Sequence, residues 1–249
     1  ALVRIALVRI ALGVIAPAKI APTEIALAEF AAGEFAPGPA LRSLVRLLLD
    51  GTLPAHAWLS LGRALSGLAI AIMIGVPLGL LTGYLRWLDR GLAPVLQFLR
   101  TVSPLAWMPI AVIVLGVGDP AVVFLVAVAA LWPILLNTAA GVRNIEPNWL
   151  LLAHSVGARG LAVLLHVGLP AVLPQLLSGI RIAVGLAWVV LVPAEMLGVS
   201  SGLGYFLLDT RDRLAYAELV AAVLAIGLLG FLLDGAVRLV EARARWSER

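Results

Sequence analysis

The feature that most constrains this chain is a series of long apolar segments. The run Ala64–Leu85 carries no charged side chain, and it exceeds the roughly 20 residues that a helix needs to cross the hydrocarbon core of a bilayer. Within it, Gly75, Gly79 and Gly83 recur every four residues. This spacing places them on one helical face, where small residues let a neighbouring helix approach closely in lipid. The run therefore predicts a tightly packed transmembrane helix.

Four further segments extend this pattern, and with the first they predict five transmembrane helices: Gly91–Gly118, Pro120–Val142, Leu173–Gly198 and Ala217–Val240. The segment that begins at Gly91 is interrupted only by Arg100, and Pro104 and Pro109 follow. Two prolines at this spacing predict a broken helix, which membranes tolerate only where the backbone faces protein or a water-filled cavity.

Composition supports the same class. Apolar residues make up 62% of the chain and charged residues 13%, against roughly 45–50% and 25% in soluble domains. The chain contains no cysteine, which excludes disulfides and thiolate metal sites. We therefore expect an all-α integral membrane protein.

The first 40 residues differ from the rest and form a degenerate five-residue repeat that begins ALVRI ALVRI. A period of five advances about 140° per unit around a helix, so it makes no continuous apolar stripe. The longest uncharged run, Ile10–Ala18, is too short to span a bilayer. We expect an N-terminal arm or a degenerate first helix over residues 1–40, and a core over residues 41–249. Pro37–Gly38–Pro39 breaks the chain before an amphipathic, interfacial helix over Leu41–Asp50.

Arginine placement predicts the orientation, since basic residues favour the cytoplasmic side. Counting crossings places one set of arginines on a single side: Arg86, Arg90, Arg143, Arg159, Arg243, Arg245 and Arg249. The opposite side holds Asp119 and the segment Ser200–Glu218, whose charges nearly balance. The loop over residues 145–172 is therefore predicted to be cytoplasmic.

That loop contains a short helical segment. Asn148 is suited to cap a helix that starts at Trp149, and Gly157 to end it in the left-handed conformation. Such a helix is too short to cross the membrane, so we expect a docking element.

Several stretches of the chain resemble ABC-transporter permeases. The spacing of Leu151-Leu152-Ala153, Gly157 and Val167-Gly168-Leu169-Pro170 resembles the EAA loop of that family, although leucines stand where the glutamate and first alanine are expected. Other stretches resemble its nitrate/sulfonate/taurine branch: Ser60–Arg63, Asp89–Ile110, Ile134–Pro147 and Ser178–Tyr205. The resemblance covers about residues 39 to 249.

This resemblance implies a type I ABC importer permease fold in a bacterial plasma membrane. It implies a small-anion substrate, such as a sulfonate, taurine, nitrate, bicarbonate or an aromatic carboxylate. The expected partners are a second permease copy, two ATPase subunits that carry ATP and Mg²⁺, and a periplasmic or lipid-anchored binding protein. No cofactor or metal is expected in this chain.

The candidate site residues fall into three groups. The resemblance and the helical spacing assign ATPase docking to Trp149, Leu151, Leu152, Ala153, Val156, Gly157, Leu169 and Pro170. Charges at membrane depth usually face the protein interior, which makes Arg100, Arg181 and Glu195 candidates for the translocation path. Pro104 joins them because it lies at the predicted helix break. Arg181 and Glu195 lie about 21 Å apart along a helix, too far to pair directly. Gly202, Leu203 and Gly204 are candidates for a periplasmic gate.

Other functions find little support. The only lysine, Lys19, follows no glycine-rich loop, so the chain lacks a Walker A motif and cannot be the ATPase. Two alternatives remain. A secondary transporter would need inverted repeats and would take up substrate without ATP, whereas a membrane scaffold would not stimulate an ATPase partner in response to substrate.

Overall fold

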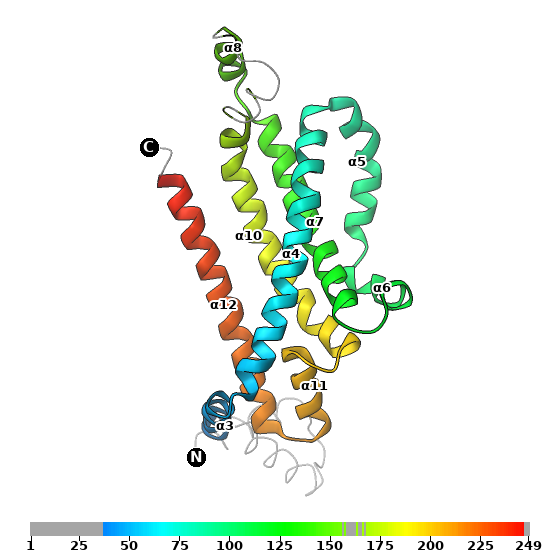
Figure 1. Cartoon of the computed structure of the whole chain (residues 1–249), viewed down its shortest axis with the longest axis vertical. Helices are drawn as coiled ribbons and strands as arrows, with labels where there is room; N and C mark the ends of the chain where they lie inside the picture. The colour runs from blue at the N-terminus through cyan, green and yellow to red at the C-terminus, as the bar shows by residue number, and fades with distance from the viewer. Residues whose placement is uncertain (1–36, 156, 158–162, 164–165, 167, 247–249) are drawn as a thin grey trace, which may run out of the picture.

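The computed structural model describes residues 37–155, 157, 163, 166 and 168–246. All regular elements within these residues are helices, and the long ones run along a common axis (Figure 1). The prediction of an N-terminal arm falls mostly on residues 1–36, which lie outside the described residues.

Four described helices are long and apolar enough to cross a membrane: α4 (Thr52–Tyr84), α7 (Asp119–Arg143), α10 (Leu169–Gly198) and α12 (Tyr216–Trp246). A fifth candidate crossing is bent. Helix α5 (Arg86–Thr101) is followed by the 3-10 turn η1 (Pro104–Trp107) and by α6 (Met108–Leu115). The segments Ala93–Thr101 and Pro104–Leu115 meet at 88°. The predicted break in the second membrane segment is confirmed, and the described residues hold four candidate membrane spans, or five if this bent pair is one span.

Two predicted helix starts are wrong. Helix α4 begins at Thr52 rather than Ala64, because Arg63 is buried against acidic partners instead of marking the membrane boundary. Helix α10 begins at Leu169 rather than Leu173. Pro170 is compatible with this earlier start, since the first turn of a helix needs no backbone N–H from proline.

Helix α7 lies between α4 and α10 and forms the centre of the bundle. The predicted glycine face of α4 packs on α7. A Cβ added at Gly79 would lie 2.6 Å from the Cβ of Thr138, and one at Gly83 would lie 2.6 Å from the Cβ of Val142. These distances are well inside van der Waals contact, so the two backbones approach as closely as they do only because these residues are glycines.

The two ends of the bundle differ (Figure 1). The turn between α4 and α5, helix α8 (Pro147–Ser155) and the C-terminal end of α12 lie together, and we call this the α8 end. Helices α3 (Pro37–Leu49) and α11 (Leu203–Asp212) lie at the opposite end, the α11 end. The described arginines predicted to share one side belong to segments at the α8 end: Arg86, Arg90, Arg143, Arg243 and Arg245. Arg159 and Arg249 lie outside the described residues.

Helix α3 starts at Pro37, so the segment predicted to break the chain instead opens a helix. Proline is well suited to a first helical turn, because its fixed φ is helical. Ala40 and Leu47 are buried, whereas Leu41, Val45 and Leu49 are exposed. The amphipathic pattern predicted for this segment is therefore present, with one apolar side packed on the bundle and another left open.

Candidate functional site

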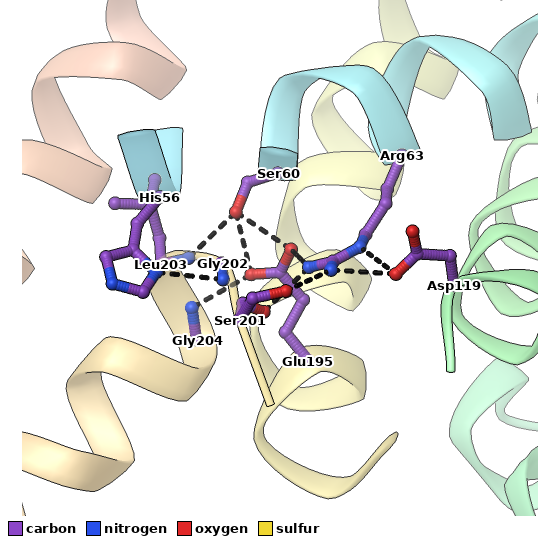
Figure 2. A network of polar contacts seen from close by, with 9 residues as sticks. All are labelled: His56, Ser60, Arg63, Asp119, Glu195, Ser201, Gly202, Leu203 and Gly204. Atoms are coloured by element: carbon purple, nitrogen blue, oxygen red, sulfur yellow. Dashed lines mark hydrogen bonds and ion pairs between the residues drawn. The ribbon is translucent and has the colours of Figure 1, made fainter. Parts of the chain in front are cut away.

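A buried ion pair organises the α11 end of the bundle (Figure 2). The side chain of Arg63, on α4, is 4% exposed and that of Glu195, near the end of α10, is 0% exposed. The Nη1 of Arg63 donates to the Oε1 of Glu195 at 2.7 Å. Ser60, one helical turn before Arg63, has its Oγ 2.8 Å from both carboxylate oxygens. A carboxylate this buried requires such partners, because an unpaired charge in a protein interior is strongly destabilising.

Arg63 also reaches two further elements. Its Nε and Nη2 contact the Oδ1 of Asp119, the first residue of α7, at 2.9 and 2.8 Å. Its Nη1 donates to the backbone carbonyl of Ser201 and its Nη2 to the Oγ of Ser201, both at 2.7 Å. The planar guanidinium offers several donors in a fixed arrangement. One side chain therefore joins α4, α7, α10 and the loop that follows α10.

The backbone of that loop is held in turn by side chains. The amide N–H groups of Gly202, Leu203 and Gly204 donate to the Nδ1 of His56, the Oγ of Ser60 and the Oε2 of Glu195, at 3.0, 2.8 and 2.9 Å. These amides open helix α11, whose first N–H groups have no partner within the helix. Glu195 thus accepts a hydrogen bond at the N-terminus of α11, where a negative charge is also favoured by the helix dipole.

The predicted periplasmic gate therefore coincides with a fully bonded polar network. The segment Ser200–Glu218, which the sequence places between two membrane segments, contains helix α11. Gly202 adopts the positive φ of 102° that its type allows. Within the described residues, no group of three His, Asp or Glu is placed to hold a metal ion, so the network is organised by hydrogen bonds and ion pairs.

The helix break displays a second polar feature. Arg100 lies in the last turn of α5 and is exposed, and Pro104 opens the turn η1 three residues after α5 ends. Arg100 has no ion pair with any residue that the structure describes, in contrast to Arg63. An exposed guanidinium beside irregular backbone is stable at membrane depth only if water or another protein surface meets it.

Arg181, the other cationic path candidate, is tied to α12. Its Nε lies 3.4 Å from the Oδ1 of Asp234, and its Nη1 lies 3.6 Å from the Oε2 of Glu241. Arg181 and Glu195 thus pair with different partners, as their separation along α10 predicts. A place for either of them on a translocation path stays a prediction.

The predicted docking element, helix α8, stands beyond the ends of the long helices (Figure 1). We call it the coupling segment after this predicted role. Trp149 and Leu152 are 61% and 65% exposed, whereas Ala153 is buried. Leu169 and Pro170 are exposed at the start of α10. Val156 lies outside the described residues, and Leu151 is described only as part of the helical backbone of α8.

Of the two predicted ends of this helix, the C-terminal one is confirmed and the N-terminal one is wrong. Gly157 has a φ of 82°, so the left-handed conformation predicted for it is confirmed. The Asn148 cap is wrong, because α8 already begins at Pro147. The side chain of Asn148 donates instead to Glu146 at 3.0 Å, and the indole Nε1 of Trp149 also reaches Glu146, at 3.3 Å. Proline takes the first helical position, where no donor is required.

With this geometry described, comparison with known proteins decides the family. Residues 75–246 match the family model described as "Binding-protein-dependent transport system inner membrane component". The chain belongs to this family of transport permeases.

Similar family members are named for small oxyanions. The chain is 40% identical over 189 residues to the bicarbonate transport system permease protein CmpB of Synechococcus elongatus, covering 75% of this chain and 66% of that protein. It is 38% identical over 184 residues to the nitrate import permease protein NrtB of Leptolyngbya laminosa, covering 74% and 66%. It is 36% identical over 202 residues to the putative aliphatic sulfonates transport permease protein SsuC of Escherichia coli, covering 81% and 77%.

The permease fold is also found in a solved structure. A chain of the inward-facing MetNI methionine ABC transporter superposes with a TM-score of 0.63 at 18% identity, covering 75% of this chain and 93% of that chain. The predicted type I importer fold is confirmed at the level of architecture.

Sequence reasoning identified Glu195 and the loop residues of this permease but not their partners. Ser60 and Arg63 appear in the sequence only as part of a stretch that resembles the family, and Asp119 only as a charge between two spans. His56 carries no recognisable signal. The position of Arg63 directly before a long apolar run could have indicated that the helix starts earlier and buries the charge.

Proposed function

We propose that this chain is the transmembrane permease subunit of an ATP-driven, binding-protein-dependent importer of a small anion in a bacterial plasma membrane. Two copies enclose the path, two ATPase subunits carrying ATP and Mg²⁺ bind the α8 ends, and a periplasmic or lipid-anchored binding protein delivers the substrate. The names of the relatives, which refer to bicarbonate, nitrate and aliphatic sulfonates, support a small oxyanion as the substrate class.

The observation that carries this proposal is the exposed coupling segment at the arginine-rich end. Trp149 and Leu152 are exposed on a short helix that stands beyond the long helices (Figure 1), and exposed apolar groups of this kind mark protein interaction sites. Leucine occupies the position of the glutamate expected in this loop, so apolar burial takes over as the main contact with the ATPase. Burying each such side chain contributes about 1.5–3 kcal/mol.

Substitution of Leu152 by Asp tests the docking role. The variant loses this apolar burial and places a charge in the interface, so the ATPase subunit should dissociate during purification of the complex. Leu214→Asp is a matched control, because Leu214 is also 65% exposed but lies at the α11 end. A Leu152→Asp complex that copurifies in full with its ATPase would show that the docking site lies elsewhere.

The helix break supports a path for anions. Arg100 is exposed, and a water-filled path between two copies of the chain would hydrate both its charge and the irregular backbone near Pro104. A small oxyanion in this path would meet a planar, bidentate donor. Uptake of bicarbonate, nitrate and sulfonates by vesicles that contain the permease, its ATPase and its binding protein tests the substrate class. Uptake without ATP by the permease alone would overturn the proposal.

A further inference from the structure

Arg63 differs from the other cations at the α11 end because its side chain is buried and held by contacts on several sides. Its guanidinium contacts a carboxylate from α7, a carboxylate from α10 and two oxygens of Ser201. Arg46, at the same end, pairs with Glu218 but remains mostly exposed. Arg63 therefore acts as a junction of several elements, whereas Arg46 forms a surface pair.

The loop after α10 is also tightly packed. A Cβ added at Gly202 would overlap the carboxylate of Glu195 and the guanidinium of Arg63, and one at Gly204 would overlap the backbone carbonyl of Val192. Three successive amides are held by His56, Ser60 and Glu195 (Figure 2). Two of these three acceptors, His56 and Ser60, belong to α4 and the third, Glu195, to α10. The loop therefore cannot leave α4 without breaking its bonds to the imidazole of His56 and to the buried hydroxyl of Ser60.

We propose that Arg63 and Glu195 are positioning residues that clamp the loop and α11 to α4, so that the ends of α4, α10 and α11 move as one body throughout the transport cycle. Leu203 and Gly204 are then fixed parts of this body. Opening at the α11 end therefore takes place between this body and the rest of the transporter, not within it. Asp119, whose side chain is 63% exposed, is the one carboxylate of the network that can separate from Arg63 into water. The network therefore has a permanent part, around Glu195, and a releasable part, at α7.

Hydrogen exchange tests the clamp without knowledge of the transported anion. In lipid nanodiscs, the amides of Gly202, Leu203 and Gly204 should exchange slowly in the wild-type chain. Arg63→Gln removes the cation beside a buried carboxylate, so their exchange should accelerate about tenfold or more. Arg63→Lys should have an intermediate effect, because it keeps the charge but loses the planar fork. The control Arg46→Gln should leave these amides unchanged. Equal exchange in Arg63→Gln and the wild type would overturn the assignment.

A covalent link tests whether the clamp persists during the cycle. The chain has no cysteine, and His56 on α4 lies beside Tyr205 on α11, with ring centroids 6.4 Å apart. The double variant His56→Cys, Tyr205→Cys is assembled with the ATPase subunit, and ATP hydrolysis is compared before and after oxidation. Two cysteines oxidise to one disulfide as an added two-electron oxidant, such as copper phenanthroline with oxygen, takes up the electrons and two protons are released.

The rigid-body proposal predicts the same ATP hydrolysis rate in the oxidised and reduced forms. A rate that falls on oxidation and returns on addition of a reductant would show that α11 separates from α4, which overturns the proposal. Free-thiol labelling counts the disulfides formed, so that the two rates are compared for the cross-linked fraction alone. Failure of the ATPase subunit to bind would instead refute the proposed function, while the hydrogen-exchange result on the chain alone would still decide the clamp.

Discussion

Substituting Gly79 by alanine should destabilise the bundle by separating its two most closely packed helices. The new Cβ would lie 2.6 Å from the Cβ of Thr138 and 2.7 Å from the backbone oxygen of Leu135, where unstrained carbon contacts need about 3.5–4.0 Å. Neither neighbour can move away by side-chain rotation, because one atom is backbone and the other is attached directly to it. Helices α4 and α7 must therefore shift apart by about 1 Å, and gaps of this size forfeit a quarter to a half of each affected contact.

The expected loss is about 1–3 kcal/mol, as in other overpacked cores. Thermal unfolding of the purified chain in detergent, followed by the fluorescence of its seven tryptophans, measures it. Gly75→Ala should cost less, because its nearest contact is a side-chain methyl of Ile134 at 3.1 Å. Gly185→Ala is the control: it has nothing within 4 Å, and alanine is better than glycine in a helix by about 0.5–1 kcal/mol.

The order of the unfolding temperatures of these glycine variants is the decisive result. Thr138→Ala should not rescue Gly79→Ala, because the Cβ that causes the overlap remains. If Gly79→Ala unfolds at the same temperature as Gly185→Ala, then α4 and α7 do not pack through this face and the reasoning fails.

Two further predictions concern the proposed transport function. Arg100→Lys should lower anion uptake more than it lowers assembly with the ATPase, because lysine cannot form the bidentate contact, and Arg100→Ala should nearly abolish uptake. Arg211→Lys, at the α11 end, is the control. Wild-type uptake by the Arg100→Lys variant would show that Arg100 only anchors the helix end. Gly157→Val should strain the left-handed turn after α8 by about 1–2 kcal/mol, so substrate-stimulated ATP hydrolysis should fall while membrane insertion is unchanged; normal stimulation would remove this glycine from the coupling mechanism.

The sequence was sufficient for the parts of the structure that depend on local pattern. Apolar runs located the four candidate membrane helices and the bent pair, since any helix in lipid must present apolar side chains over a bilayer-spanning length. The broken second segment followed from Pro104 and Pro109, and the left-handed turn followed from Gly157. The glycine face of α4 predicted close packing, because spacing by four residues is itself a statement about one helical face.

The polar network at the α11 end was decided by tertiary structure alone. Its members come from positions 56 to 63, 119, 195 and 201 to 204, and no periodicity connects residues that far apart. From the apolar pattern alone, Arg63 stands at the edge of a membrane segment, because an arginine beside an apolar run ordinarily marks the water boundary. Folding instead brings Glu195 and Asp119 to it, and pairing makes burial of the charge tolerable. The sequence by itself determined which segments enter the membrane, because that depends on the solvent each segment can accept. Only the tertiary structure decided which charged side chains are buried, because that depends on the partners that each charge finds in the folded chain.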